Sequence, residues 1–193
     1  MNVYDFDKTI YDGESTVDFY FFCLKRHTKM VLLLPSLIGG YLRYYVFKKG
    51  SKTQFKETMY RFLRYCDADK DVKDFWETHI SKVKDWYIKQ KKSDDVIISA
   101  SPEFLLNPCG EKLGFHVIAS KVDKNSGKYN GKNCYYDEKV KRYRKIYGNA
   151  VIDEFYSDHY SDEPLAQISE RAFIVDKNTI IDWDHNKHIK PHI

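Results

Sequence analysis

Cysteine is scarce in this sequence, which contains only Cys23, Cys66, Cys109 and Cys134. No two of them form a Cys-x-x-Cys pair, and no nearby histidine completes a zinc-binding spacing. The chain also begins without the basic and apolar segments of a secretory signal. These absences exclude a disulfide-stapled extracellular domain and predict reduced thiols in a cytoplasmic protein.

A strong excess of one charge is also missing, because 32 basic and 28 acidic residues leave a net charge of +4. Such a mild excess fits an enzyme with an anionic substrate and is too small to indicate nucleic-acid binding. The sequence has no internal repeat, no low-complexity segment and no sign of an obligate protein partner. We therefore expect one folded domain of 193 residues, with an insert at most.

No apolar run reaches the roughly 20 residues that a membrane-spanning helix needs. The nearest candidate is the segment 30–47, which is apolar and aromatic but interrupted by Pro35, two glycines and Arg43. Basic residues flank this segment on both sides. The favoured interpretation is the core of a helical unit. The alternative is a patch that contacts an anionic membrane surface from the cytoplasmic side.

The hydrophobic period changes twice along the chain. Residues 2–6 form a short strand, and residues 15–91 repeat apolar side chains at helical spacing. Beyond them, apolar strand-like segments alternate with helices, and the unbroken run 96–98 is typical of a strand buried on both faces. This alternation predicts an α/β fold with a three-layer, mainly parallel, Rossmann-like sheet. Residues 1–14 and 92–193 would form the core, and residues 15–91 a helical cap inserted after the first strand.

Residues with useful chemistry follow the predicted strands. Asp5 and Asp7 end the first strand and point the same way, so a cation or a shared proton must relieve their repulsion. Ser99 ends the next buried strand just before a helix, where hydroxyl and N–H groups can bind a phosphate. Asp158 and Asp162 follow a later strand. Sites in open parallel sheets lie beyond these carboxyl ends, so we expect the side chains to meet there.

The donor types favour phosphate chemistry at such a site. Hard carboxylate oxygens that leave room for water suit Mg²⁺. Lys139, at the start of a predicted helix, could share with the metal the neutralisation of a transferring phosphoryl group. Lys141 is a rival for this role.

At this point the chain resembles the haloacid dehalogenase-like phosphatases. The segment from Asp5 to Thr9 matches their D-x-D-x-T signature, and residues 96–99 resemble their second motif, an apolar strand that ends in serine or threonine. Lys139 resembles the third motif, and residues 158–162 have the D-x-x-x-D spacing of the fourth. The motifs occur in the family's order along the whole chain. The place of the insert resembles the subclass that contains the phosphoserine phosphatases.

The resemblance implies a role for each matching residue. Asp5 would be the nucleophile that carries an aspartyl phosphate. Asp7 would be the general acid and base. Mg²⁺ would be bound by Asp5, the backbone carbonyl of Asp7 and Asp158, and Asp162 would be a further ligand or would orient one. Ser99 and Lys139 would bind the phosphate, and Thr9 would support the loop.

Some positions depart from the family pattern or allow another interpretation. Lys8 stands where many relatives have glycine, and the bulky His159 follows Asp158. Asp162 could cap a helix, and for Ser101 we favour helix capping over phosphate binding. The C-terminal histidines, His185, His188 and His192, are expected in an exposed tail.

The sequence leaves alternatives for the identity of the substrate and for whether the protein hydrolyses a phosphoester at all. Weaker similarity to the phosphatidylglycerophosphate phosphatase branch, together with segment 30–47, implies a lipid or other amphiphilic phosphomonoester. Glu14 stands where phosphoserine phosphatases have a glutamate for the substrate's amino group, so a small soluble phosphoester is the alternative. A phospho-acceptor signalling domain has similar acids and a lysine but does not need Asp7.

Overall fold

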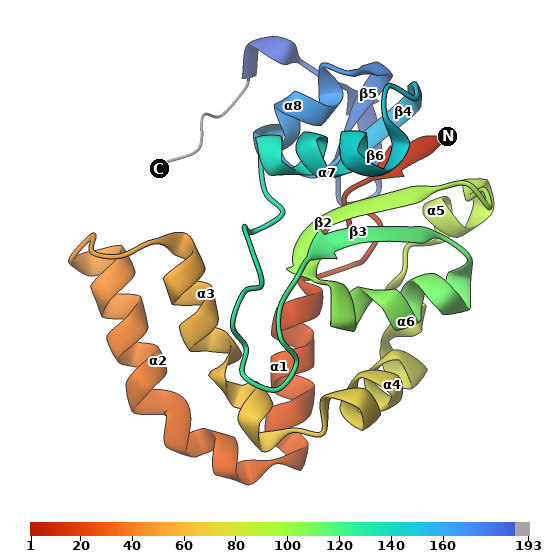
Figure 1. Cartoon of the computed structure of the whole chain (residues 1–193). Helices are drawn as coiled ribbons and strands as arrows, with labels where there is room; N and C mark the ends of the chain where they lie inside the picture. The colour runs from red at the N-terminus through yellow and green to blue at the C-terminus, as the bar shows by residue number, and fades with distance from the viewer. Residues whose placement is uncertain (188–193) are drawn as a thin grey trace.

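The computed structural model describes residues 1–187, apart from the side chain of Lys52. Its centre is one sheet in the order β3-β2-β1-β4-β5-β6, parallel throughout except that β6 pairs antiparallel with β5 (Figure 1). The predicted α/β fold with a mainly parallel sheet is therefore confirmed. The strands are β1 (Asn2–Tyr4), β2 (Val96–Pro102), β3 (His116–Ser120), β4 (Ile152–Ser157), β5 (Ser169–Asp176) and β6 (Thr179–Asp182).

Successive strand residues supply two separate hydrophobic clusters, one on each face of the sheet. In β1, Tyr4 belongs to one cluster and Val3 to the other, and in β2, Ile97 and Ile98 divide in the same way. The sheet is therefore buried on both faces, as its continuous apolar strands predict. The helices of the layers that cover it are α4 (Ala68–His79), α5 (Asp85–Gln90) and α6 (Glu103–Leu113) on the Tyr4 face, and α7 (Asp137–Tyr147) and α8 (Glu163–Ala166) on the other.

The remaining helices follow β1. They are α1 (Ser15–Arg26), the 3₁₀ helix η1 (Thr28–Leu33), α2 (Leu34–Tyr41), the π-helical turn η2 (Leu42–Val46), α3 (Lys52–Tyr60) and the 3₁₀ helices η3 (Arg61–Tyr65) and η4 (Ile80–Lys82). The hairpin of α2 and α3 stands away from the sheet (Figure 1). No strand of the six-stranded sheet comes from residues 15–91.

The helical insert nevertheless packs firmly against the core. Trp76 of α4 is fully buried, and its indole N–H donates to the carbonyl oxygen of Leu105 in α6 at 2.6 Å. The Trp76 ring also meets Phe6 edge-on, with ring centroids 6.0 Å apart. One hydrophobic cluster therefore extends from the insert to the Tyr4 face of the sheet. The division into core and cap remains a prediction, and α4 is the part of the insert most closely joined to the core.

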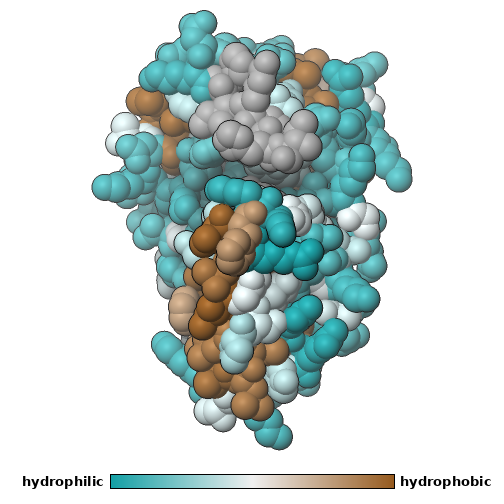
Figure 2. Space-filling view, turned by 90° about the vertical axis from the view of Figure 1, so that its left-hand side faces the viewer, coloured by the Kyte–Doolittle hydropathy of each residue, from teal (hydrophilic) through white to brown (hydrophobic). Residues whose placement is uncertain are grey.

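Segment 30–47 does not form the core of the helical unit, contrary to the favoured interpretation. Only Met30 is fully buried, and none of the residues of α2 is buried. Figure 2, which views the molecule from the left-hand side of Figure 1, shows apolar residues gathered in a stripe. We call it the apolar stripe; its exposed large residues are Val31, Leu32, Leu34, Ile38, Tyr41, Leu42, Tyr45, Val46 and Phe47. Among residues 1–187, no helix is long and apolar enough to cross a membrane.

The loop between β3 and α7, residues 121–136, leaves the core and reaches the insert (Figure 1). The N–H of Tyr129 donates to Glu57 of α3 at 3.0 Å. Gly127 lies so close to Tyr60 that a Cβ atom at this glycine would be 2.5 Å from the carbonyl oxygen of Tyr60. Within the loop, a single antiparallel bridge joins Val122 to Tyr129. We call residues 121–136 the strap.

The predicted histidine tail is only partly described. His185 is half exposed, and its Nδ1 lies 2.8 Å from a carboxylate oxygen of Glu163. His188 and His192 lie outside the described residues.

Candidate active site

Residues that follow β1, β2 and β4 surround one pocket with a volume of about 440 Å³. Six of the seven predicted site residues contribute to its wall, and Thr9 lies beneath it. The ends of neighbouring parallel strands bring these residues together, as the sequence predicted. The wall residues among them are Asp5, Asp7, Ser99, Lys139, Asp158 and Asp162.

Lys139 is the centre of a buried ionic cluster. Its Nζ lies 2.7 Å from Oδ1 of Asp5 and 2.6 Å from Oδ2 of Asp162. The hydroxyl of Ser157 donates to the same oxygen of Asp162 at 2.8 Å. Asp162 therefore orients the lysine and caps no helix with its side chain.

The electrostatics separate the two candidate lysines. Burial alone would lower the pKa of Lys139, but the carboxylates of Asp162 and Asp5 outweigh it and hold this pKa above its usual range. Lys139 therefore stays charged beside Asp5. Lys141 points away and pairs with the exposed Asp137 at 2.9 Å.

Asp7 is held by two donors. The backbone N–H of Ser15, at the start of α1, donates to its Oδ1 at 2.6 Å, and the hydroxyl of Ser101 donates to its Oδ2 at 2.5 Å. Burial raises the pKa of Asp7, and these hydrogen bonds oppose that rise. The interpretation of Ser101 as a helix cap was wrong, because Pro102 occupies the N-cap of α6 and the hydroxyl turns toward Asp7.

Ser99 and Thr9 occupy different depths of the site. Ser99 lines the pocket, and its hydroxyl accepts a hydrogen bond from the N–H of Ser101 at 3.1 Å. Thr9 is fully buried, and its hydroxyl accepts the N–H of Asp158 at 2.9 Å. Thr9 thus joins the loop after β1 to the loop after β4.

The donors at the site fit a magnesium ion. Asp5 and Asp158 both line the pocket, and burial raises the pKa of each carboxyl, that of Asp158 to about 6. A nearby cation would offset this cost of ionisation. Mg²⁺ usually takes one or two carboxylates and keeps several waters. The Asp5 and Asp158 carboxylates and the Asp7 carbonyl would therefore suffice to hold it.

Lys8 has a φ angle of 59°, in the left-handed region that glycine adopts without strain. Its ammonium group pairs with Glu14 at the pocket rim. Its carbonyl oxygen accepts a hydrogen bond at 2.5 Å from Lys84, a buried lysine that also donates to the carbonyl of Lys177 at 2.5 Å. Lys84 thereby fixes the backbone at Lys8, the position where many relatives have glycine.

The insert supplies the side of the pocket that faces away from the sheet. Lys56 and Tyr60 of α3 add polar groups there, and Tyr135 of the strap adds another. Val17, Phe55 and Met59 line this pocket and also an apolar groove beside it, with a volume of about 360 Å³. Sequence reasoning missed these residues, since helical spacing was the only signal that they carried.

Comparisons with known proteins agree with this arrangement. A family model described as haloacid dehalogenase-like hydrolase matches residues 3–167. No curated protein matches the sequence.

Solved structures share the fold at low sequence identity. A protein of unknown function from Bordetella pertussis Tohama I has a TM-score of 0.70 and 17% identity, over 89% of this chain and 87% of that chain. A cytosolic 5'-nucleotidase IIIB bound to cytidine has a TM-score of 0.57 and 13% identity, over 88% and 69%. A phosphoserine phosphohydrolase-like protein from Francisella tularensis subsp. tularensis SCHU S4 has 0.53 and 15%, over 89% and 86%.

Proposed function

Because this chain belongs to the haloacid dehalogenase-like hydrolase family, we propose that it is a magnesium-dependent phosphomonoester hydrolase with Asp5 as its nucleophile. The observation that carries the proposal is the ionic cluster around Lys139, whose Nζ lies 2.7 Å from Asp5. This ammonium group can neutralise phosphoryl oxygens next to the attacking carboxylate. Asp5, the Asp7 carbonyl and Asp158 would hold Mg²⁺, which would neutralise further negative charge on the phosphoryl group.

The reaction has two steps. A carboxylate oxygen of Asp5 attacks phosphorus while the bond to the leaving oxygen breaks, and Asp7 gives that oxygen a proton. Asp7 then takes a proton from water, whose oxygen attacks phosphorus and releases inorganic phosphate and free Asp5. Ser99 and Lys139 bind the phosphoryl oxygens in both steps, and Thr9 supports the loop from beneath.

Asp7 argues for turnover and against a phospho-acceptor domain. Its carboxyl is held by Ser101 and by the N–H of Ser15 at the wall of the pocket. A protein that only stores an aspartyl phosphate has no need of an oriented second acid.

We propose an amphiphilic phosphomonoester as the substrate. The apolar groove lies beside the catalytic pocket, and Val17, Phe55 and Met59 line both. The far side of that groove is formed by Ile38 and Tyr41, which also belong to the exposed apolar stripe. A phosphate at Asp5 could therefore extend an apolar tail along a continuous apolar path.

The apolar stripe also suits peripheral contact with an anionic membrane. Leu32 is 73% exposed and Phe47 is 65% exposed. Lys48 and Lys49 follow the stripe directly and are exposed. Apolar side chains beside lysines are typical of segments that lie in the headgroup region of an anionic bilayer.

The first test is turnover of p-nitrophenyl phosphate with and without Mg²⁺. We expect phosphate release that requires Mg²⁺ and that Asp5→Asn abolishes without loss of the fold. Asp7→Asn should slow release by about 10²–10⁴-fold, the usual contribution of a general acid or base. Full turnover by Asp5→Asn would exclude this residue as the nucleophile, and no turnover of any phosphoester would favour the phospho-acceptor domain.

The second test compares a phosphatidyl phosphomonoester in anionic vesicles with phosphoserine. We expect turnover of the lipid and a loss of vesicle binding in the double variant Leu32→Ser/Phe47→Ser, with p-nitrophenyl phosphate turnover unchanged. Ile146→Ser, which removes an equally exposed apolar residue from α7, is the matched control. Preference for phosphoserine would instead support the small soluble substrate and give Glu14 at the pocket rim a role.

A further inference from the structure

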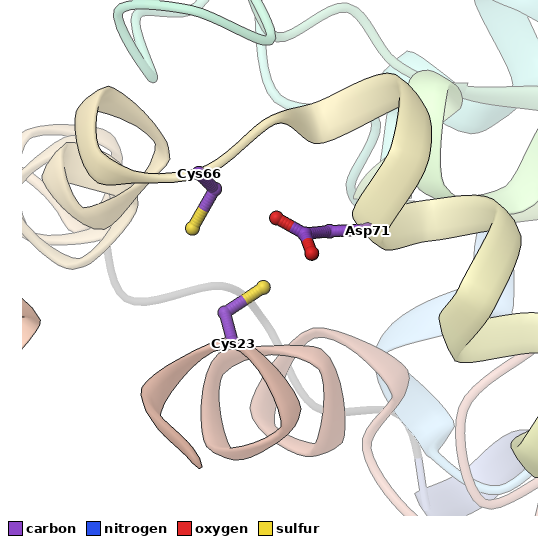
Figure 3. Close-up of side chains that lie close together, drawn as sticks. All are labelled: Cys23, Cys66 and Asp71. Atoms are coloured by element: carbon purple, nitrogen blue, oxygen red, sulfur yellow. The ribbon is translucent and has the colours of Figure 1, made fainter. Parts of the chain in front are cut away.

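Two cysteines and an aspartate converge inside the insert, far from the catalytic pocket. Cys23 comes from α1, Cys66 follows η3, and Asp71 comes from α4 (Figure 3). The two sulfur atoms and a carboxylate oxygen all lie within 4.8 Å of one another. The cysteines are 43 positions apart in the sequence, which is why no zinc-ligand spacing was visible there.

The cluster is enclosed but reachable. Cys23 is fully buried and the side chain of Asp71 is 4% exposed, whereas Cys66 is half-buried. Two thiolates and a carboxylate this close would repel one another strongly, so their joint ionisation requires a cation between them.

Neighbouring side chains orient the carboxylate of Asp71 and offset part of the negative charge of the cluster. Nε2 of His27 lies 2.7 Å from Oδ2 of Asp71, and a guanidinium N–H of Arg26 donates to Oδ1 at 3.3 Å. Such partners fix the orientation of a ligating carboxylate. Three ligand charges around a divalent cation leave one negative charge, which Arg26 offsets in part, because it also pairs with Asp74 at 2.7 Å. The thioether sulfur of Met30 lies 3.9 Å from the sulfur of Cys66.

We propose that Cys23, Cys66 and Asp71 form a binding site for a thiophilic divalent cation of the zinc class. Tetrahedral Zn–S bonds of about 2.3 Å place two sulfur atoms about 3.8 Å apart, so small side-chain rotations suffice. Water or Met30 completes the fourth position. The soft sulfur donors separate this site from the catalytic acids, whose oxygens suit Mg²⁺.

A cation here would link α1 to α4. The first residue of α1 is Ser15, whose N–H holds Asp7, and α4 carries Trp76 against the core. The site is therefore structural and independent of the proposed reaction. It stabilises the insert by tying together two helices that are far apart in the sequence.

The test uses the full chain, reduced and freed of metal by a chelator, and titrated with Co²⁺. We expect sulfur-to-cobalt charge-transfer absorption in the near ultraviolet, which oxygen ligands at the catalytic site cannot produce. Cys66→Ala and Cys23→Ala should each abolish or strongly weaken this band. Cys109→Ala, which removes another buried thiol, should leave it unchanged.

A second measurement is the melting temperature with added Zn²⁺. Zn²⁺ should raise it for the native chain and for Cys109→Ala, because a ligand that binds only the folded state stabilises it. Cys66→Ala should show no such rise. Because Cys66 is half-buried, this variant is expected to fold, as a cooperative thermal transition and an unchanged circular-dichroism spectrum would verify. Absence of the band, a band that survives both cysteine variants, or a Cys23–Cys66 disulfide in the untreated protein would overturn the proposal.

Discussion

At the scale of single residues, Asp7 depends on a hydroxyl that lies 94 positions away in the sequence. Ser101 comes from the end of β2, and Ser15 from the start of α1. Together they fix both carboxyl oxygens of Asp7, and a general acid must be fixed in this way to meet a leaving oxygen. In this account Ser101 is a positioning residue that acts through Asp7.

We expect Ser101→Ala to lower kcat by about 10- to 100-fold, because a hydrogen bond to a charged group is worth about 1.5–3 kcal/mol. The loss should be larger for an alkyl phosphate than for p-nitrophenyl phosphate, whose leaving group needs little protonation. The measurement is kcat for both substrates. Ser169→Ala, which removes a hydroxyl that donates to Leu165 far from the pocket, is the control. Equal losses for both substrates would show that Ser101 does not act through Asp7.

The residue scale also shows what the sequence could predict. The proposed catalytic acids and Lys139 could be predicted because each stands at an element end that the hydrophobic pattern marks. The contacts of Ser101 with Asp7 and of Cys23 with Cys66 join distant segments, and no local pattern encodes them. Ser101 was misjudged because a serine before a helix is a strong capping signal by itself.

At the scale of elements, the loop after β1 is held from outside by Lys84, the N-cap residue of α5. Its ammonium group joins the carbonyl oxygens of Lys8 and Lys177, both of which have positive φ angles. Burial lowers the pKa of Lys84, and the carboxylates of Asp12 and Asp158 oppose this shift. One buried cation thus connects the catalytic loop to the turn between β5 and β6.

We expect Lys84→Met to lower the free energy of unfolding by about 2 kcal/mol, because it leaves two carbonyl oxygens without their charged donor. It should also lower kcat, since the loop that carries Asp7 loses the anchor at the neighbouring Lys8. Denaturant unfolding and p-nitrophenyl phosphate turnover check these effects. Lys82→Met is the control, because it removes a partly exposed ion pair with Asp18 and a contact with the Tyr11 ring but no hydrogen bond to the Lys8 carbonyl. Unchanged kcat in Lys84→Met would limit Lys84 to a role in stability.

Element positions followed from the sequence better than element packing did. The strand that begins at Val96 and the helix after it were predictable from the apolar run, but β2 runs to Pro102 and not only to Ser99. Segment 30–47 was misinterpreted because an apolar composition alone does not tell whether another element covers it. The helical spacing of α4 indicated that Trp76 lies on a buried face, but it did not indicate that this face would pack against α6 or that α2 would stay uncovered.

At the scale of the whole molecule, the strap joins core and insert through a close backbone contact. Gly127 has a φ angle of 73°, and a Cβ atom there would lie 2.6 Å from Cβ of Tyr60. Lys124 of the strap also pairs with Asp69 in α4, with Nζ 2.6 Å from Oδ1. The strap therefore touches both the α3 end and the α4 start of the insert.

We expect Gly127→Ala to lower the free energy of unfolding by about 1–3 kcal/mol, because it adds a steric clash to the left-handed backbone strain. Gly131→Ala provides the matched control, since Gly131 also has a positive φ angle but has no atom near its Cβ position. Thermal unfolding of both variants measures the difference. An equal loss of unfolding free energy in the two variants would mean that the close contact with Tyr60 does not contribute to the destabilisation.

The strap has a further consequence for how a substrate gains entry. The insert is tethered to the core by its two chain connections, by α4 and by the strap, so we do not expect it to swing open like a lid. The freest end is the α2–α3 hairpin, which carries the apolar stripe. A molecule with a long tail would then enter sideways, passing along the stripe into the groove without first crossing open water. Access would be set by the bilayer plane, and the rate would follow the surface density of the lipid and not its concentration in bulk.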